Sequence, residues 1–257
     1  MLTTMPATAP AIVQPAGPTT APIIVPQKIV FDKATYVVMP FLSEDFADLK
    51  RWQTAEDNGR WTPGKDGLVG EWLKASPSIF LKDPIEGDYL WQITATRLQP
   101  SADFVKRFAA SKQGAGSQPR TRYNFNFWLR VADPAGEDFF KTYPKHLGTG
   151  WNGMGDDYWH SYFVTVVHKP GDNWIRLRRG PGYEKMEDVQ NLVPYMDYNQ
   201  PIQFSFLLRK GHVLGYFGSK QIFDHVDPKP YVAGRIGLCV WLDTVRFSDM
   251  RMYRFTD

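Results

Sequence analysis

The sequence lacks several features that would point to a particular class of protein. It has one cysteine, Cys239, among 257 residues, which excludes a framework of intrachain disulfides. No apolar stretch approaches the roughly 20 residues that a transmembrane helix needs, so we expect no membrane span. The formal net charge is +3 and no five like charges stand in a row, so we expect no nucleic-acid partner.

Helical periodicity is scarce as well. We expect two short helices, at residues 43–52 and 101–111, because each segment opens with a serine that is followed within two residues by an acid, as a helix N-cap is. The rest of the chain after Lys28 alternates strand-like segments with turn signals such as DPAG and KPGDN. Many antiparallel strands in one domain of this length predict an all-β, two-sheet antiparallel jelly-roll sandwich over residues 28–257.

Residues 1–27 have a different composition. They carry no charged side chain and are rich in Pro, Ala and Thr. Such a segment buries too little apolar surface to offset the entropy of ordering, so we expect a disordered tail. It lacks the basic start and apolar centre of a signal peptide. Its composition resembles the spacer that follows a removed export signal in bacterial secreted proteins, which predicts an extracellular or periplasmic location.

Aromatic residues make up 15% of the chain and recur at alternate positions with amides and arginines. In YNFNFWLRV the apolar residues, among them Phe125 and Phe127, share the face that we expect in the core. The opposite face of this segment and the outward faces of two further segments carry Asn124, Asn126, Trp128, Arg130, Trp174, Arg176, Arg178 and Trp241. If these strands adjoin, the outward side chains form one concave platform.

Such a platform suits a carbohydrate partner. The C–H face of a sugar packs on an indole ring, and its hydroxyls need paired amide, carboxylate or guanidinium groups. Forked hydrogen bonds from Arg130, Arg176 or Arg178 would also hold the carboxylate of a uronate or a sulfate, although a surface ion pair is the alternative for any single arginine. We expect no cofactor and no metal, because the acidic turns at residues 155–157 and 224–228 match no ordered ligand loop and suit the capping of backbone N–H groups.

Two stretches resemble a known family. Residues 157–183, DYWHSYFVTVVHKPGDNWIRLRRGPGY, and the ending from Leu207 to Phe255 resemble the YesU-like family of concanavalin A-like jelly rolls, which is associated with polysaccharide breakdown. The ending also resembles the laminin-G-like 3-keto-glycoside hydrolases, through Gly218, the GRIGL motif at residues 234–238 and the VRFSDMR strand at residues 245–251. The E-x-D-x-x-E strand of jelly-roll endoglucanases is absent, so we expect no retaining mechanism from one strand of carboxylates.

The candidate catalytic groups lie in DDYWHSYFVTVV, residues 156–167. If Phe163 points into the core, then Tyr158, His160 and Tyr162 share the open face beside Arg176. Cleavage by β-elimination would use Arg176 or Arg178 to neutralise a uronate carboxylate and His160 or Tyr162 as the base. Tyr158 would then be one of the substrate-binding residues.

Three functions remain open at this point. The first, which we favour, is an enzyme that cleaves the glycosidic bonds of a polysaccharide or oligosaccharide by elimination or hydrolysis. Hydrolysis would need carboxyl groups, of which Asp156, Asp157 and Glu184 are the nearest in sequence. The second is a carbohydrate-binding module without catalysis. The third is a sandwich whose aromatic residues form an interface with another protein.

Overall fold

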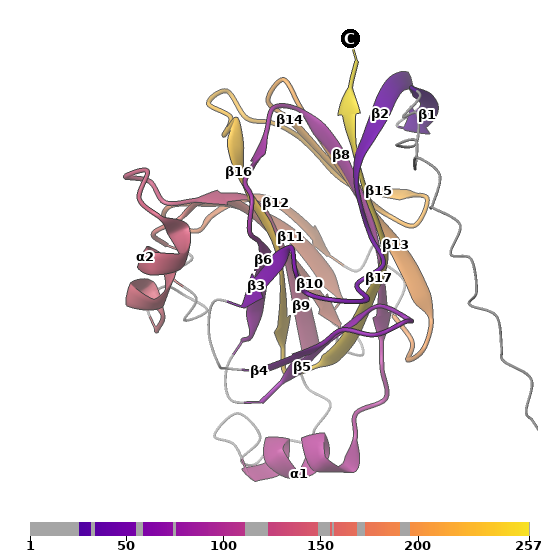
Figure 1. The fold of residues 1–257 in the computed structure, drawn as a ribbon, viewed down its shortest axis with the longest axis vertical. Helices are drawn as coiled ribbons and strands as arrows, with labels where there is room; N and C mark the ends of the chain where they lie inside the picture. Colours follow the sequence, from indigo (N-terminus) through magenta and orange to yellow (C-terminus); the bar gives the residue numbers. More distant parts are fainter. Residues whose placement is uncertain are drawn as a thin grey trace, which may run out of the picture.

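Two antiparallel β-sheets stack face to face, and two short helices lie outside them (Figure 1). We describe a computed structural model, which covers residues 26–31, 34–54, 59–73, 76–110, 123–148, 155, 157–168, 173–190 and 196–256. The predicted all-β jelly-roll sandwich is therefore confirmed. The predicted tail, residues 1–27, lies outside the described residues except for its last two, and the first strand begins at Gln27.

Sheet A has nine strands and holds both the first and the last strand that the structure describes. Seven lie side by side in the order β1 (Gln27–Phe31), β2 (Ala34–Glu44), β17 (Thr244–Phe255), β8 (Tyr89–Arg97), β13 (Pro201–Arg209), β14 (His212–Phe217) and β15 (Lys220–Val226). The other two, β4 (Gly59–Thr62) and β5 (Leu68–Trp72), pair with each other, and β5 also pairs with β17.

Sheet B has eight strands and contains the segments whose outward residues were predicted to form a platform. Seven follow the order β12 (Glu184–Gln190), β11 (Trp174–Gly180), β10 (His160–His168), β9 (Tyr123–Ala132), β16 (Ala233–Trp241), β6 (Ser78–Leu81) and β3 (Trp52–Thr54). The eighth, β7 (Ile85–Glu86), pairs with β16. Because β11, β10, β9 and β16 are successive neighbours, the expected adjacency of the platform strands is confirmed.

One of the two predicted helices is present. Helix α1 (Ala102–Ala110) begins where expected, and the Oγ of Ser101 accepts a hydrogen bond from the N–H of Phe104 at 3.0 Å. The prediction for residues 43–52 is wrong, because the carboxylates of Asp45 and Asp48 each accept a bond from the N–H two residues on and stabilise turns instead. Neither α1 nor the other helix that the structure describes, α2 (Phe139–His146), is long and apolar enough to cross a membrane.

Helix α2 (Phe139–His146) was not predicted. The Oδ1 of Asp138 accepts a hydrogen bond from the N–H of Phe140 at 3.0 Å and caps its first turn. The helix has only eight residues and contains Pro144, so the sequence shows too few turns for helical periodicity to stand out.

Aromatic side chains hold the two sheets together. Phe125 and Phe127 on β9 meet Phe204 and Phe206 on β13, with ring centroids 5.0–5.6 Å apart. Trp91 on β8 meets the ring of Phe127 edge-on at 5.6 Å. All five side chains are buried, and we call them the central aromatic cluster. Edge-to-face pairs of this kind contribute about 0.5–1.5 kcal/mol beyond the burial of their area.

A buried ion pair lies at one end of the sandwich. The Nε of Arg97, the last residue of β8, donates to the Oδ2 of Asp243 at 2.9 Å, and both side chains are buried. The Nη1 of Arg97 also donates to the carbonyl oxygen of Met196 at 3.0 Å. Burial raises the pKa of Asp243 to about 6 despite the opposing effect of Arg97. The two charges therefore depend on each other for compensation.

We expect Asp243→Asn to lower the free energy of unfolding by about 3–5 kcal/mol, because it removes the carboxylate that pairs with the buried Arg97 guanidinium. Chemical denaturation followed by tryptophan fluorescence measures the change. The matched control is Lys50→Gln, which removes an ion pair to Asp48 whose side chains are 86% and 52% exposed. The control should leave the midpoint unchanged, and equal effects of the two substitutions would contradict this account.

Candidate functional site

One end of the outer face of sheet B is filled by an aromatic cluster beneath α2. Trp128 and Phe163 lie with ring centroids 4.3 Å apart, and Phe80 packs against Trp128 at 6.0 Å. Phe139 on α2 contacts Phe80 at 4.8 Å and covers this row. Trp128 was expected on an open platform, but it is fully buried because the unpredicted helix lies over it.

The side chains of β10 face the opposite way from the prediction. Tyr162 points between the sheets with Val164 and Val166, whereas Phe163 points outward into the cluster beneath α2. A bulge between His160 and Tyr162 shifts the register with β9. Every residue from Ser161 to His168 is buried, so both faces of the strand are covered and alternation could not distinguish them.

Next to the covered end, one polar side chain from each of three adjacent strands falls into a line. Arg176 on β11 pairs with Thr165 on β10, and Thr165 pairs with Asn126 on β9. Asn126 pairs in turn with Cys239 on β16. We call Arg176, Thr165 and Asn126 the polar row. The structure thus brings Arg176 and Asn126 onto one face, as predicted, and adds Thr165, which the misassigned face of β10 had concealed.

Two tryptophans lie in the row that follows along the strands. Trp174 is opposite Val167, which pairs with Asn124, and Asn124 pairs with Trp241. Trp174 is buried, whereas Asn124 and Trp241 are partly exposed. Trp241 also packs against the small cluster around α1. The predicted grouping of Asn124, Trp174 and Trp241 on one face of sheet B therefore matches the strand register.

Arg176 is already engaged by its neighbours. Its Nε donates to the Oδ1 of Asp188 on β12 at 2.9 Å, and its guanidinium carbon lies 3.9 Å from the centroid of the Trp174 ring. Burial works to raise the pKa of Asp188, but hydrogen bonds from Arg176 and Lys185 outweigh it and lower that pKa. The carboxylate of Asp188 thus compensates the charge of Arg176.

Several buried polar atoms on this face lack a hydrogen bond. The Oδ1 of Asn126, the Oγ1 of Thr165, the Nε1 of Trp128 and the Nε of Arg178 have no partner among the residues that the structure describes. The Nδ2 of Asn126, by contrast, donates to the Oδ1 of Asn124 at 3.2 Å. An unpartnered buried polar atom costs about 1–3 kcal/mol, so these atoms carry hydrogen-bonding capacity that the described residues do not use.

The other two predicted arginines differ in position. Arg178 remains on the outer face, where its guanidinium lies 4.1 Å from the centroid of the Tyr183 ring. Arg130 has left the platform: its φ is 58°, and its guanidinium donates to the carbonyl oxygens of Gly87 and Tyr231. The prediction that Arg130 lies on the platform is therefore wrong, because a bulge in β9 opposite β16 turns its side chain toward the edge of the sandwich.

His160 and Tyr162 belong to a second group of residues, at the edge of the sandwich. The ring of His160 stacks on Tyr231 with centroids 4.9 Å apart. The hydroxyl of Tyr162 donates to the Oδ2 of Asp227 at 2.7 Å, and the Nε of Arg179 donates to the same oxygen at 2.9 Å. We call these five residues the edge cluster. Its charge-bearing arginine is Arg179, so the prediction that Arg176 neighbours His160 is wrong.

Sequence reasoning missed Arg179, although a signal was present. Because Trp174 and Arg176 are predicted to face outward, alternation places Ile175, Leu177 and Arg179 together on the inward face of β11. It pairs with Tyr162 across the strands. The guanidinium lies 4.3 Å from the centroid of the Tyr231 ring, which explains how a charge is accommodated at the end of an apolar face.

The edge cluster sets the protonation of its members. Burial and the nearby Arg179 lower the pKa of His160, and Asp133 opposes them. Burial and the hydrogen bond to Asp227 raise the pKa of Tyr162 far above its ordinary value. Tyr162 is therefore a hydrogen-bond donor at neutral pH, which does not suit the role of a base.

The remaining candidates lie beside α2 or on the surface. Tyr158 stacks on His146 with centroids 3.5 Å apart, and its hydroxyl donates to the Oδ2 of Asp133 at 3.3 Å. Asp157 and Glu184 are exposed, and Asp156 lies outside the described residues. Asp227 accepts the N–H of Lys229 at 2.8 Å, as predicted for a capping turn. Within the described ranges, no three His, Cys, Asp or Glu side chains gather in a way that would hold a metal.

Comparisons with known proteins bear on the fold. No family model and no curated protein matches the sequence. A protein of unknown function with a galectin-like fold from Bacillus subtilis is similar in structure, with a TM-score of 0.63 and 12% identity, over 90% of this chain and 99% of that one. So are the carbohydrate-binding module CBM66 from Bacillus subtilis (TM-score 0.52, 12% identity, 80% and 98%) and the β-glucanase of Bacillus licheniformis (0.51, 8%, 85% and 98%). The chain therefore has a galectin-like, concanavalin A-like jelly-roll fold.

We expect His160 to titrate below its ordinary pKa of 6.5, so that it is neutral at pH 7 and the folded state loses stability as the pH falls through that region. Arg179→Met should raise this pKa, because it removes a positive charge beside the ring. Arg176→Met is the matched control and should leave the pKa unchanged, since Arg176 lies on the other face of β11. NMR titration of the imidazole signals measures both, and equal shifts would contradict the edge cluster.

Proposed function

We propose that the protein binds carbohydrate on the outer face of sheet B. The observation that carries the proposal is the set of unpartnered polar atoms on adjacent strands of that face, above all the Oδ1 of Asn126 and the Oγ1 of Thr165. A sugar hydroxyl can donate to the first atom and accept from or donate to the second, so one ligand satisfies both. Asn126 and Thr165 of the polar row then recognise the hydroxyl groups of the sugar.

The neighbours of the polar row suit the same ligand. Trp241, which is partly exposed, supplies an indole ring in the next row, on which the C–H face of a sugar can pack. Arg178 has no ion pair with any described residue, whereas Arg176 is compensated by Asp188. For a uronate or sulfate group, Arg178 is therefore the better-suited cation. The jelly-roll fold, on which a carbohydrate-binding module and a glucanase are also built, is compatible with this ligand class.

Binding without hydrolysis fits the carboxylates better than hydrolysis does. Glycosidases of the usual kinds need two carboxyl groups about 5–9.5 Å apart across the scissile bond. Within the described strands of sheet B, the outer face next to the polar row offers one carboxylate, Asp188, and hydrogen bonds from Arg176 and Lys185 occupy it. The outward residues of β10 at this level are Phe163, Thr165 and Val167.

We expect Thr165→Val to weaken glycan binding about fivefold to tenfold without lowering protein stability, because it removes a hydroxyl that lacks a partner in the free protein but keeps the side-chain shape. Thr142→Val is the matched control. The Oγ1 of Thr142 lies 3.2 and 3.3 Å from backbone carbonyl oxygens of Asp138 and Phe139, so the control should lower stability and leave binding intact.

Isothermal titration calorimetry with neutral and uronate-containing oligosaccharides measures the affinity, and thermal unfolding measures the stability. A Thr165→Val protein that binds normally but unfolds more readily would assign the hydroxyl a structural role and overturn the proposal. Trp241→Ala is expected to weaken binding about tenfold through loss of ring contact.

A second candidate function is cleavage of glycosidic bonds by β-elimination at the edge cluster. The observation that favours it is His160, which is partly exposed, has a lowered pKa and lies beside Arg179. A neutral imidazole of this kind suits removal of the C5 proton of a uronate. Absorbance of unsaturated products is then expected to appear with the wild-type protein, to disappear with His160→Ala, and to persist with the control His212→Ala. Glycan binding without any product would contradict the cleavage function and would leave binding as the only proposed function.

A further inference from the structure

The outer face of sheet A carries a broad band of polar side chains. On β8 the outward residues Gln92, Thr94 and Thr96 follow one another at alternate positions. In register with Gln92 and Thr94, the next strand, β13, presents Ser205 and Gln203. On the other side, β17 presents Arg251, Ser248 and Arg246 opposite the same three residues of β8. We call these eight residues the sheet A band.

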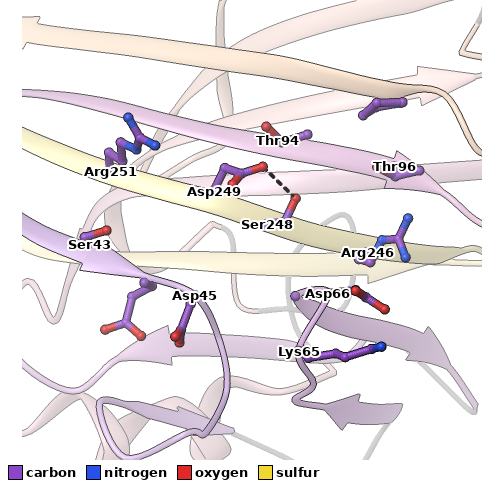
Figure 2. A pocket seen from close by; sticks show the side chains of 13 residues that line it. Ser43, Asp45, Lys65, Asp66, Thr94, Thr96, Arg246, Ser248, Asp249 and Arg251 are labelled. Carbon is purple, nitrogen blue, oxygen red and sulfur yellow. Dashed lines mark hydrogen bonds between the residues drawn. The ribbon is translucent and has the colours of Figure 1, made fainter.

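One end of the band forms a charged hollow of about 420 Å³, which Figure 2 shows. Thr94 and Ser248 lie at its centre, with Arg246 and Arg251 to either side along β17. Lys65 and Asp66 line its far wall, and the hydroxyl of Ser248 donates to the Oδ2 of Asp249 at 3.3 Å. Neither of the two arginines has an ion pair with a described residue. The hollow thus has positively and negatively charged side chains around the hydroxyl groups of Thr94 and Ser248.

The other end of the band forms a neutral hollow of about 460 Å³. None of its lining residues is charged at neutral pH; they are Val30, Phe31, Gln92, Gln203, Ser205, Tyr216, Gly218, Ser219 and Gln221. The glutamine amides and the serine hydroxyls supply both donors and acceptors. Two such hollows fall within the size range of small-ligand sites, about 300–1,000 Å³.

An aromatic wall closes the neutral hollow on one side. Phe31, the last residue of β1, lies with its ring centroid 4.6 Å from that of Tyr216 on β14. The same hydrophobic cluster as Phe31 contains three leucines from the next row along the strands, which are Leu90, Leu207 and Leu214. The β1–β2 hairpin therefore covers the apolar end of the outer face of sheet A, and the partly exposed Tyr216 lines the hollow together with the glutamines.

The two hollows adjoin along β8. Thr94 lines the charged hollow and Gln92 the neutral one, and residues two apart on a strand lie about 6.8 Å apart on the same face. Gln203, which pairs with Thr94, lines the neutral hollow as well. A linear ligand that lies across β14, β13, β8 and β17 meets polar groups of both hollows in succession.

We infer that the outer face of sheet A is a second binding site, which takes a neutral saccharide in the hollow of Gln92, Gln203, Gln221 and Tyr216. Sugar hydroxyls both donate and accept, which matches amides and serine hydroxyls better than it matches ions. Tyr216 and Phe31 offer ring surface for the C–H face of one sugar unit. A longer chain continues past Thr94 toward Ser248.

The polarity of this face alone would not support the inference, because one face of an antiparallel sheet is commonly solvated. A solvated face is ordinarily rich in lysine and glutamate, and the neutral hollow has neither. The hollow itself and the aromatic wall beside the amides are the additional observations. The site does not depend on the function proposed for sheet B, because it lies on the opposite outer face of the sandwich.

The test is a titration of ¹⁵N-labelled full-length protein with neutral hexasaccharides of glucose, mannose and xylose, one at a time. We expect one of them to shift the side-chain amide signals of Gln92, Gln203 and Gln221, while that of Gln99, which lies in an exposed loop outside the hollow, stays in place. Tyr216→Ala should weaken this binding at least tenfold. Tyr216→Phe keeps the ring and should retain most of the affinity.

The two faces are distinguished by their variants. Thr165→Val should leave the shifts of the three glutamine signals unchanged, and Tyr216→Ala should leave binding at sheet B unchanged. The second site is overturned if none of the three hexasaccharides shifts the glutamine signals and if Tyr216→Ala leaves the affinity for all three unchanged. This holds whatever the result for sheet B. A loss of the glutamine shifts in Thr165→Val would equally overturn it, because the two faces would then be one site.

Discussion

The contact between the inner faces of the two sheets is the constraint on which the rest of the molecule depends. The central aromatic cluster fixes β9 against β13 and β8, and a strand that slipped by one residue would carry its aromatic rings to the outside. With the inner face settled, strand geometry dictates which side chains face outward. The positions of the polar row and of the sheet A band both follow from the packing of the two inner faces.

Each outer face is divided in the same way, although the covering elements are unrelated. On sheet B, α2 buries the row of Trp128 and Phe163, and polar side chains follow in the next row. On sheet A, the β1–β2 hairpin buries the row of Leu90 and Leu207, and again polar side chains follow. In both cases an accessory element removes apolar surface from water and leaves a bordered polar strip, so that each strip has an aromatic wall at one end.

Much of this arrangement could be predicted from the sequence, and the failures have identifiable physical causes. Strands with one apolar and one polar face gave correct orientations, as for Asn126 on β9 and Trp174 and Arg176 on β11. Alternation failed on β10, because apolar residues cover both of its faces, and at Arg130, where a positive φ interrupts the strand. The burial of Trp128 could not be foreseen without α2, and the role of Arg179 depends on a contact with Asp227 that is 48 residues away in the chain.

The separation of the α2 cluster from the main core has a consequence for how such a domain can change. Phe80, Trp128, Phe163 and the residues of α2 form their own hydrophobic cluster, which does not include the central aromatic cluster. The connection between β9 and β10 can therefore be lengthened, shortened or exchanged while the sandwich stays intact. Because rows on a strand repeat every two residues, each such change would cover or expose the polar strip of sheet B in steps of about 6.8 Å. The length of that strip therefore depends on the connection between two strands and not on the core.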